Sequence, residues 1–233
     1  MKFKEIFTEG KASSEDNIKA IEKFIKGFDN PSRSPEDKFY DYSNSRIRIS
    51  NTYEADLKYS DIISGLDAGI QDVVTLKVTE HHTELIGTKE IIGKSVDVRI
   101  QVGYNSDGVI KSESVTDVST SSLKKAYKTV LKKLRNDKSA KLKILAEILK
   151  YRKPLSKSEA KKSTSMGHAS MSSTVVQTSY EEVVDISDLL KIFDEKDFQA
   201  AVNADYSLKK SNISFNFEDG LMDKSGTWSE TWD

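Results

Sequence analysis

Residues 95–117, SVDVRIQVGYNSDGVIKSESVTD, decide the fold class of this protein. In the first half of the stretch, apolar residues alternate with polar ones at Val96, Val98, Ile100 and Val102. This period of two is typical of a strand with one buried and one wet face. The tetrapeptide NSDG at 105–108 is suited to reversing the chain, with Gly108 able to take a positive φ. The stretch therefore predicts a hairpin in an antiparallel sheet.

The period changes on both sides of this hairpin. A period of two dominates residues 46–118, whereas apolar residues recur every three or four positions over 13–28. After a Ser/Thr cluster at 119–122, which suits a helix N-cap, the helical period returns over 122–135 and 139–151. The pattern predicts an α+β fold: an antiparallel sheet with an N-terminal amphipathic helix and two basic helices packed on it.

Composition further divides the chain. A Ser- and Lys-rich stretch with few bulky apolar residues follows Pro154 and predicts a linker. Strand and helix patterns resume beyond it in a small acidic α/β segment. The expected organisation is a possible targeting peptide at 1–10, an α+β domain at 11–153, the linker at 154–173 and the C-terminal segment at 174–233.

The absence of some residue types restricts the chemistry and the location. The chain contains no Cys, so disulfides, thiolate nucleophiles and Cys-based zinc sites are excluded. No apolar run approaches the length of about 20 residues that spans a bilayer, and the N-terminus lacks the apolar stretch of a secretory signal. We expect the protein in a virion or in host cytoplasm, neither secreted nor membrane-spanning.

A formal net charge of −1 conceals a strong segregation of charge. Between residues 123 and 163, 15 Lys and Arg face 3 acids, whereas from 181 to 233, 13 acids face 5 Lys. A basic block of this kind is typical of a surface that follows phosphates. The predicted contact residues for DNA or a protein partner are Lys124, Lys125, Lys128, Lys132, Lys133, Arg135, Lys138, Lys141, Lys143 and Arg152.

Two alternatives to nucleic-acid binding stay open for the basic block. Its lysines can be the solvated faces of two amphipathic helices. They can also dock against the acidic C-terminal part, within one chain or between neighbours, which would promote self-association. The two helices have the outline of a helix-turn-helix, but no Asn, Gln or Arg cluster stands at the start of the second one, where base edges would be read.

The chain closes with WSETWD, which suggests a partner-binding tail. Exposed Trp beside acidic residues is a common anchor for a basic pocket on a partner. The alternative is that the two Trp side chains cover an open face of the sheet. The predicted residues of this tail are Trp228, Glu230, Trp232 and Asp233.

No catalytic, cofactor or metal motif is present. The chain lacks a G-x-S-x-G nucleophile turn and both common glycine-rich phosphate loops. His81 and His82 would point to opposite faces of a strand, so they cannot chelate one metal ion. Glu80, His82 and Glu84 would share a face. We therefore predict no catalytic residues, no cofactor and no metal ligands; an enzyme of unfamiliar type remains the third alternative.

The N-terminal decapeptide MKFKEIFTEG carries the one family resemblance. It resembles the short targeting peptides of T-even-type bacteriophage proteins that are packed into the immature head and trimmed after a Glu by the head maturation protease. The resemblance implies cleavage between Glu9 and Gly10. The alternative is that Phe3, Ile6 and Phe7 form the first packed turn of the domain.

These observations favour a non-enzymatic protein that works through assembly. The leading hypothesis is a bacteriophage virion or head-associated protein whose basic helices contact packaged DNA or a neighbouring acidic tail. The alternative is a cytoplasmic nucleic-acid-binding accessory protein in which the acidic tail regulates the basic surface.

Overall fold

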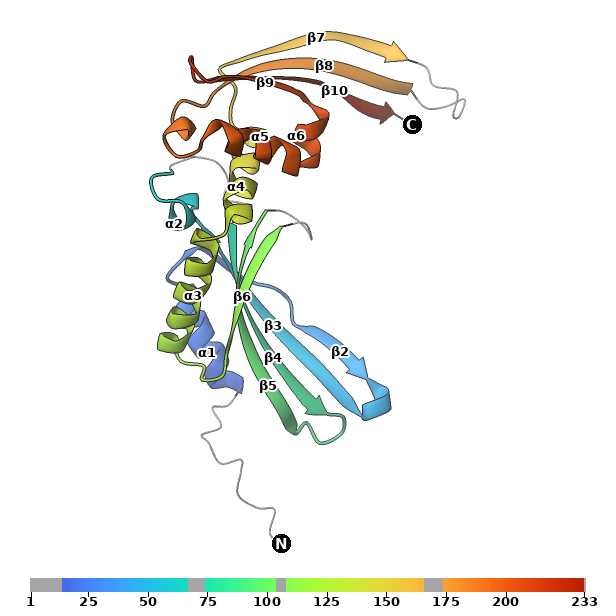
Figure 1. Cartoon of the computed structure of the whole chain (residues 1–233). Coiled ribbons are helices and arrows are strands. Elements are labelled where there is room, and N and C mark those ends of the chain that lie inside the picture. Colours follow the sequence, from blue (N-terminus) through green and yellow to red (C-terminus); the bar gives the residue numbers. More distant parts are fainter. Residues whose placement is uncertain (1–13, 67–73, 104–107, 166–173, 233) are drawn as a thin grey trace. The chain divides into compact units, whose positions relative to one another are not determined.

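A computed structural model describes residues 14–66, 74–103, 108–165 and 174–232 of the chain. The chain forms two compact units. Unit 1 comprises Met1–Ile62 and Asp72–Asp137, and unit 2 comprises Ile63–Gln71 and Lys138–Asp233. Each unit combines helices with its own antiparallel sheet, so the predicted α+β class is confirmed (Figure 1).

Unit 1 is built on a six-stranded antiparallel sheet. The strand order is β1-β3-β4-β5-β6, and β2 also pairs with β3. Neighbouring strands are joined mainly by short connections, which is the simplest way to build an antiparallel sheet. The strands are β1 (Asp29–Arg33), β2 (Asp37–Asp41), β3 (Arg46–Leu57), β4 (Val74–Leu85), β5 (Ile91–Val102) and β6 (Val109–Val115).

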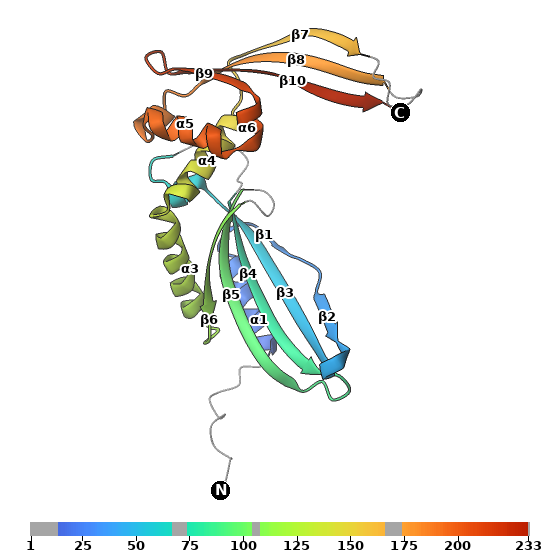
Figure 2. The same ribbon diagram turned by 45° about the vertical axis from the view of Figure 1, so that its right-hand side comes forward.

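Two helices cover one face of this sheet (Figure 2). Helix α1 (Ser14–Ile25) packs against β3 and β4, and α3 (Thr120–Arg135) packs against β5, β6 and α1. Ser119 caps α3 in a reciprocal capping box with Ser122, as the Ser/Thr cluster predicted. The one-turn helix α2 (Tyr59–Ile62) and the 3-10 turn η1 (Tyr42–Asn44) complete the unit.

The alternating pattern of the strands produces the core of unit 1. On β4, Val74, Leu76 and Val78 are fully buried, while the residues between them lie on the open face. Along α3, Leu123, Val130, Leu134 and their neighbours bury the apolar stripe. The rings of Phe24, Phe28 and Tyr127 meet edge to face between α1 and α3. Burial raises the pKa of the Tyr127 phenol to about 12.

The β5–β6 hairpin forms as predicted, with Val102 opposite Val109. Its turn at 104–107 lies outside the described residues. The expectation of a positive φ at Gly108 was wrong, because the positive φ, 95°, belongs to Gly103. Gly108 is needed for a different reason: a Cβ there would lie 2.6 Å from the carbonyl oxygen of Val102.

Unit 2 is a four-stranded antiparallel sheet with the strand order β7-β8-β10-β9. Helices α4, α5 and α6 lie on one side of it (Figure 1). The elements are α4 (Lys138–Tyr151), β7 (Ser156–Ser165), β8 (Thr174–Asp185), the 3-10 turn η2 (Leu189–Lys191), α5 (Glu195–Ala204), α6 (Tyr206–Lys210), β9 (Asn212–Asn216) and β10 (Leu221–Trp232).

Two features of unit 2 differ from the sequence-based expectation. The predicted linker at 154–173 contains strand β7, and residues 166–173 lie outside the described residues. A Ser- and Lys-rich segment can form a strand at a sheet edge because its main chain pairs with β8. The second basic helix, α4, was expected to pack on the first sheet; it belongs to unit 2 and packs against α5 and α6.

No helix among the described residues is long and apolar enough to cross a membrane.

Candidate functional site

Helix α3 presents an exposed row of lysines on the side opposite its buried stripe. Four of its lysines are exposed and form no ion pair within the described part of the chain: Lys124, Lys125, Lys128 and Lys132. We call these four residues the α3 lysine face. Three of them recur at spacings of three and four residues and so lie along one side of the helix, over about 10 Å of its axis.

The two other cations of α3 contact neighbouring elements of unit 1. Lys133 Nζ lies 2.6 Å from Glu113 Oε2 on β6. Arg135 donates from Nε to the backbone carbonyl of Asp61, with an N–O distance of 2.8 Å. Both cations therefore contribute less to an external contact than the α3 lysine face does.

Cations of α4 and of the residue that follows it are paired with the acidic C-terminal part of the chain. Lys138 Nζ lies 3.4 Å from Asp197 Oδ1 on α5. Just beyond the end of α4, an Arg152 guanidinium nitrogen lies 2.7 Å from Asp188 Oδ1. Lys141 is half-buried and forms no ion pair among the described residues. In unit 2, α4 thus docks against the acidic C-terminal part of the same chain, which was one of the alternatives to nucleic-acid binding.

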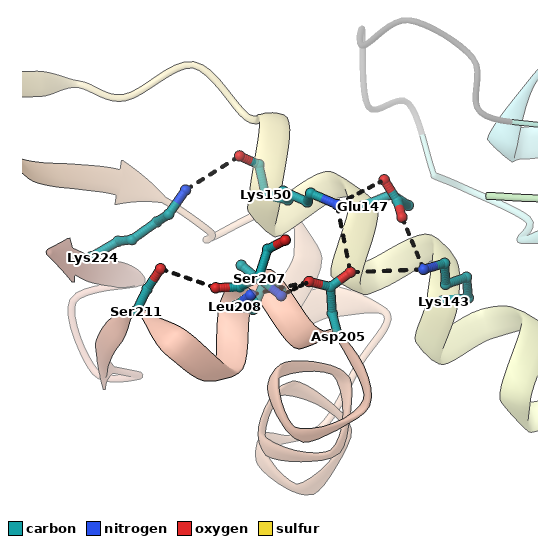
Figure 3. Close-up of polar contacts among 8 residues, drawn as sticks. All are labelled: Lys143, Glu147, Lys150, Asp205, Ser207, Leu208, Ser211 and Lys224. Atoms are coloured by element: carbon teal, nitrogen blue, oxygen red, sulfur yellow. Dashed lines mark hydrogen bonds and ion pairs between the residues drawn. The ribbon is translucent and has the colours of Figure 1, made fainter. Parts of the chain in front are cut away.

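A partly buried cluster of four charges extends this pairing (Figure 3). Lys143 Nζ lies 3.1 Å from Glu147 Oε1 and 3.7 Å from Asp205 Oδ2. Lys150 Nζ lies 4.0 Å from Glu147 Oε2 and 3.6 Å from Asp205 Oδ2. Both carboxylates are buried and need these partners, because an isolated buried charge is strongly unfavourable. The cluster joins α4 to the junction of α5 and α6.

Asp205 also organises the backbone at that junction. Its Oδ1 accepts hydrogen bonds from the N–H groups of Ser207 and Leu208, which caps α6. Burial alone would raise the pKa of Asp205. The Leu208 N–H and the ammonium groups of Lys150 and Lys143 outweigh burial and hold its pKa below the ordinary value.

The lowered pKa of Asp205 predicts acid-sensitive stability in unit 2. The charged form stabilises the folded state above the unfolded pKa, about 3.9, and this contribution is lost as the pH falls through the lower folded pKa. We expect Asp205→Asn, which can still cap α6, to lower the free energy of unfolding by about 1–2 kcal/mol at neutral pH. The difference from the unsubstituted protein should become smaller as the pH falls through the lower folded pKa of Asp205.

Urea unfolding followed by Trp fluorescence, repeated from pH 7 to pH 2, measures this difference. Both tryptophans lie on β10 and therefore report on unit 2. Asp223→Asn, at an exposed position of the same strand, is the matched control and should leave the pH profile unchanged. A gap between Asp205→Asn and the unsubstituted protein that keeps the same size from pH 7 to pH 2 would contradict the ionic explanation.

The ten predicted contact residues therefore do not form one equivalent set. Four make up the α3 lysine face, Lys133 and Arg135 are bound within unit 1, and Lys138, Lys143 and Arg152 pair with acids of unit 2. Sequence reasoning missed Asp205 as the partner of α4. Its position at the end of one helix and the start of another was the available signal, since Asp is a preferred N-cap residue.

The predicted partner-binding tail is part of the unit 2 sheet. The backbone at Trp228, Glu230 and Trp232 pairs with β8, with Trp228 opposite Thr178 and Trp232 opposite Thr174. Asp233 lies outside the described residues. Deletion of this tail would thus remove part of β10, a strand that pairs along its whole length with β8.

The two histidines of β4 lie on opposite faces, as predicted. His82, together with Glu80 and Glu84, occupies the covered face: its Nδ1 lies 3.0 Å from Glu80 Oε1 and its Nε2 lies 3.5 Å from Glu84 Oε1. His81 Nδ1 lies 2.7 Å from Ser50 Oγ on the open face. Burial, aided by the nearby Arg48, lowers the pKa of His81.

Glu80 is the centre of a buried polar cluster in unit 1. It is fully buried and accepts a hydrogen bond from Asn51 Nδ2 at 3.1 Å, while Arg33 donates to Asn51 Oδ1 at 2.9 Å. No group of three or more His, Cys, Asp or Glu among the described residues could hold a metal ion. The contacts of Glu80, Asn51 and Arg33 form a hydrogen-bond network that links β4, β3 and β1.

No protein-family model, curated protein or solved structure matches the chain. The possible cleavage site, Glu9 and Gly10, lies outside the described residues.

Proposed function

We propose that this chain is a non-enzymatic, bacteriophage head-associated protein that contacts packaged double-stranded DNA through the α3 lysine face. The observation that carries the proposal is the difference between the two basic helices. Lysines of α4 pair with acids inside unit 2, whereas the α3 lysine face is exposed and has no ion-pair partner among the described residues. The resemblance of MKFKEIFTEG to head-targeting peptides supports the location.

The physical basis of the contact is counterion release. Each lysine that neutralises a phosphate displaces a condensed cation, so affinity depends steeply on salt and little on base sequence. If all four lysines make such contacts, the log–log slope of affinity against salt concentration should be about −3.6. Duplexes of unrelated sequence should bind with the same affinity.

The test is the salt dependence of binding to a fluorescent DNA duplex between 50 and 200 mM salt. The double variant Lys125→Gln/Lys128→Gln should lose about two units of the log–log slope and bind about 30-fold more weakly at 150 mM salt. Both positions are exposed, so the fold should be retained.

Lys196→Gln/Lys209→Gln is the matched control, because it removes the same charge from two exposed positions of unit 2. It should leave the slope unchanged. Equal losses in the two double variants would show a general charge effect and overturn the assignment to α3, as would a slope that the α3 variant does not alter.

A second candidate is a nucleic-acid-binding accessory protein of the cytoplasm. The ion pairs of Lys138, Lys143 and Arg152 with acidic residues favour it, because an acidic segment that limits the basic surface would make such contacts. The intact mass of the protein from its native source separates the candidates. A chain that begins at Gly10 inside particles is expected for the head-associated protein; one that begins at Met1 and is absent from particles would favour the accessory protein.

A further inference from the structure

Unit 2 contains a pocket with an unusual concentration of cationic and hydroxyl groups. The pocket has a volume of about 470 Å³, within the range of small-molecule sites. Lysines reach it from three elements, Lys150 from α4, Lys210 from α6 and Lys224 from β10. No carboxylate of the residues that the structure describes lines it. The remaining lining residues are Tyr180, Tyr206, Ser207, Leu208, Ser211, Gly226 and Thr227.

Two of the lysines are held in place by the protein. Lys224 donates from Nζ to the backbone carbonyl of Lys150 at 3.4 Å (Figure 3). Its Nζ also lies 3.8 Å from Glu182 Oε2. Burial would lower the pKa of Lys150, but Glu147 and Asp205 outweigh it and hold that pKa above the ordinary value. Both side chains are thus held in place as hydrogen-bond donors by neighbouring groups of unit 2.

The third lysine, Lys210, has no ion-pair partner among the described residues. Its Nζ lies 4.3 Å from the centre of the Tyr206 ring, a cation–π contact at an exposed site. Lys150 and Lys224 each have acidic neighbours behind them, so Lys210 is the lining lysine that is free to meet an incoming anion. Its neighbour Lys209 is also exposed but does not line the pocket.

The pocket is also rich in hydrogen-bond donors. The hydroxyls of Tyr180 and Ser211 lie 3.2 Å apart at one side, and Ser207 and Thr227 add two more. Gly226 leaves room for the Tyr180 ring, since a Cβ there would lie 2.8 Å from the Tyr180 hydroxyl oxygen. Ammonium and hydroxyl groups around a cavity without carboxylates match the acceptor oxygens of a phosphate.

We propose that this pocket binds the phosphate groups of a small phosphorylated ligand. Its volume exceeds that of one phosphate and suits two or three linked phosphates or a nucleotide. A larger hollow on the same sheet, of about 710 Å³, does not share this character, because Glu181, Glu182 and Asp223 line it together with Lys157 and Lys224. The proposal concerns unit 2 and is independent of DNA binding by the α3 lysine face.

The test is calorimetric titration of the full chain with inorganic pyrophosphate, ATP and adenosine at constant ionic strength. Pyrophosphate and ATP should bind, and adenosine should not. Lys210→Gln should weaken pyrophosphate binding at least about tenfold. Lys209→Gln, the matched control, should have no effect. ATP that binds more tightly than pyrophosphate would identify a nucleotide; equal affinity would identify the phosphates alone as the recognised group.

The variant Lys125→Gln/Lys128→Gln separates this site from the α3 lysine face and should bind pyrophosphate as well as the unsubstituted protein does. Thr227→Val is a second test, at a lining position on β10, and should also weaken binding. Pyrophosphate binding weaker than about 1 mM, or losses of equal size in Lys209→Gln and Lys210→Gln, would overturn the proposal.

Discussion

Glu80→Ala is expected to lower the free energy of unfolding of unit 1 by about 3 kcal/mol. The side chain is fully buried on β4, and its removal leaves Asn51 Nδ2 and His82 Nδ1 without their carboxylate partner. Buried polar groups that lose a partner keep the cost of desolvation. Because Asn51 also accepts from Arg33, the loss should extend through the whole network.

Hydrogen exchange of the β4 and β5 amides, together with urea unfolding followed by circular dichroism, measures this change. Glu54→Ala is the matched control: Glu54 lies on the open face and pairs with Lys77 at 2.8 Å, so its loss should cost less than about 1 kcal/mol. Glu80→Gln retains the side-chain volume and one acceptor oxygen. Its loss of unfolding free energy should lie between those of Glu80→Ala and Glu54→Ala. If Glu80→Ala costs no more than Glu54→Ala, the buried network is not a stabilising feature of unit 1.

Phe198→Ala is expected to destabilise unit 2 by about 3–5 kcal/mol. Phe198 is fully buried on α5, and its ring meets those of Phe193, Phe215 and Phe217 edge to face at centroid distances of 5.5–6.4 Å. Truncation leaves a cavity bordered by three rings that cannot all move into it. The loss combines the transfer free energy of the ring with the lost aromatic contacts.

Urea unfolding followed by Trp fluorescence reports this loss, because both tryptophans are on β10. Phe198→Leu, which keeps most of the apolar volume, should cost much less. Tyr206→Ala removes an exposed aromatic ring from the same unit and should change stability by less than about 1 kcal/mol. A cost for Phe198→Ala similar to that for Tyr206→Ala would show that the ring cluster is not the core of unit 2.

The candidate site was only partly predictable, because ion pairs form between residues that are far apart in the sequence. The exposure of Lys125 and Lys128 follows from the helical period, since both lie opposite the apolar stripe of α3. The pairing of Lys143 and Lys150 does not follow from it, because Asp205 stands more than 50 residues further on. Two successive helices with similar lysine patterns therefore differ: Lys143 and Lys150 of α4 form ion pairs, whereas the α3 lysine face forms none among the described residues.

The sequence by itself determined those features that depend on local periodicity. Alternation over 95–117 determined the β5–β6 hairpin, and Ser119 determined the start of α3. It also placed Glu80, His82 and Glu84 on one face of a strand. These features need only the geometry of a strand or a helix turn.

Only the tertiary structure decided which surfaces meet. It assigned α4 to the second unit, because the apolar residues of α4 lie against α5 and α6 and its cations against acids of that unit. It formed β7 from a segment without apolar periodicity, because hydrogen bonds to β8 do not depend on side chains. It also gathered Lys150, Lys210 and Lys224 around one pocket, since distant segments converge only when the chain folds.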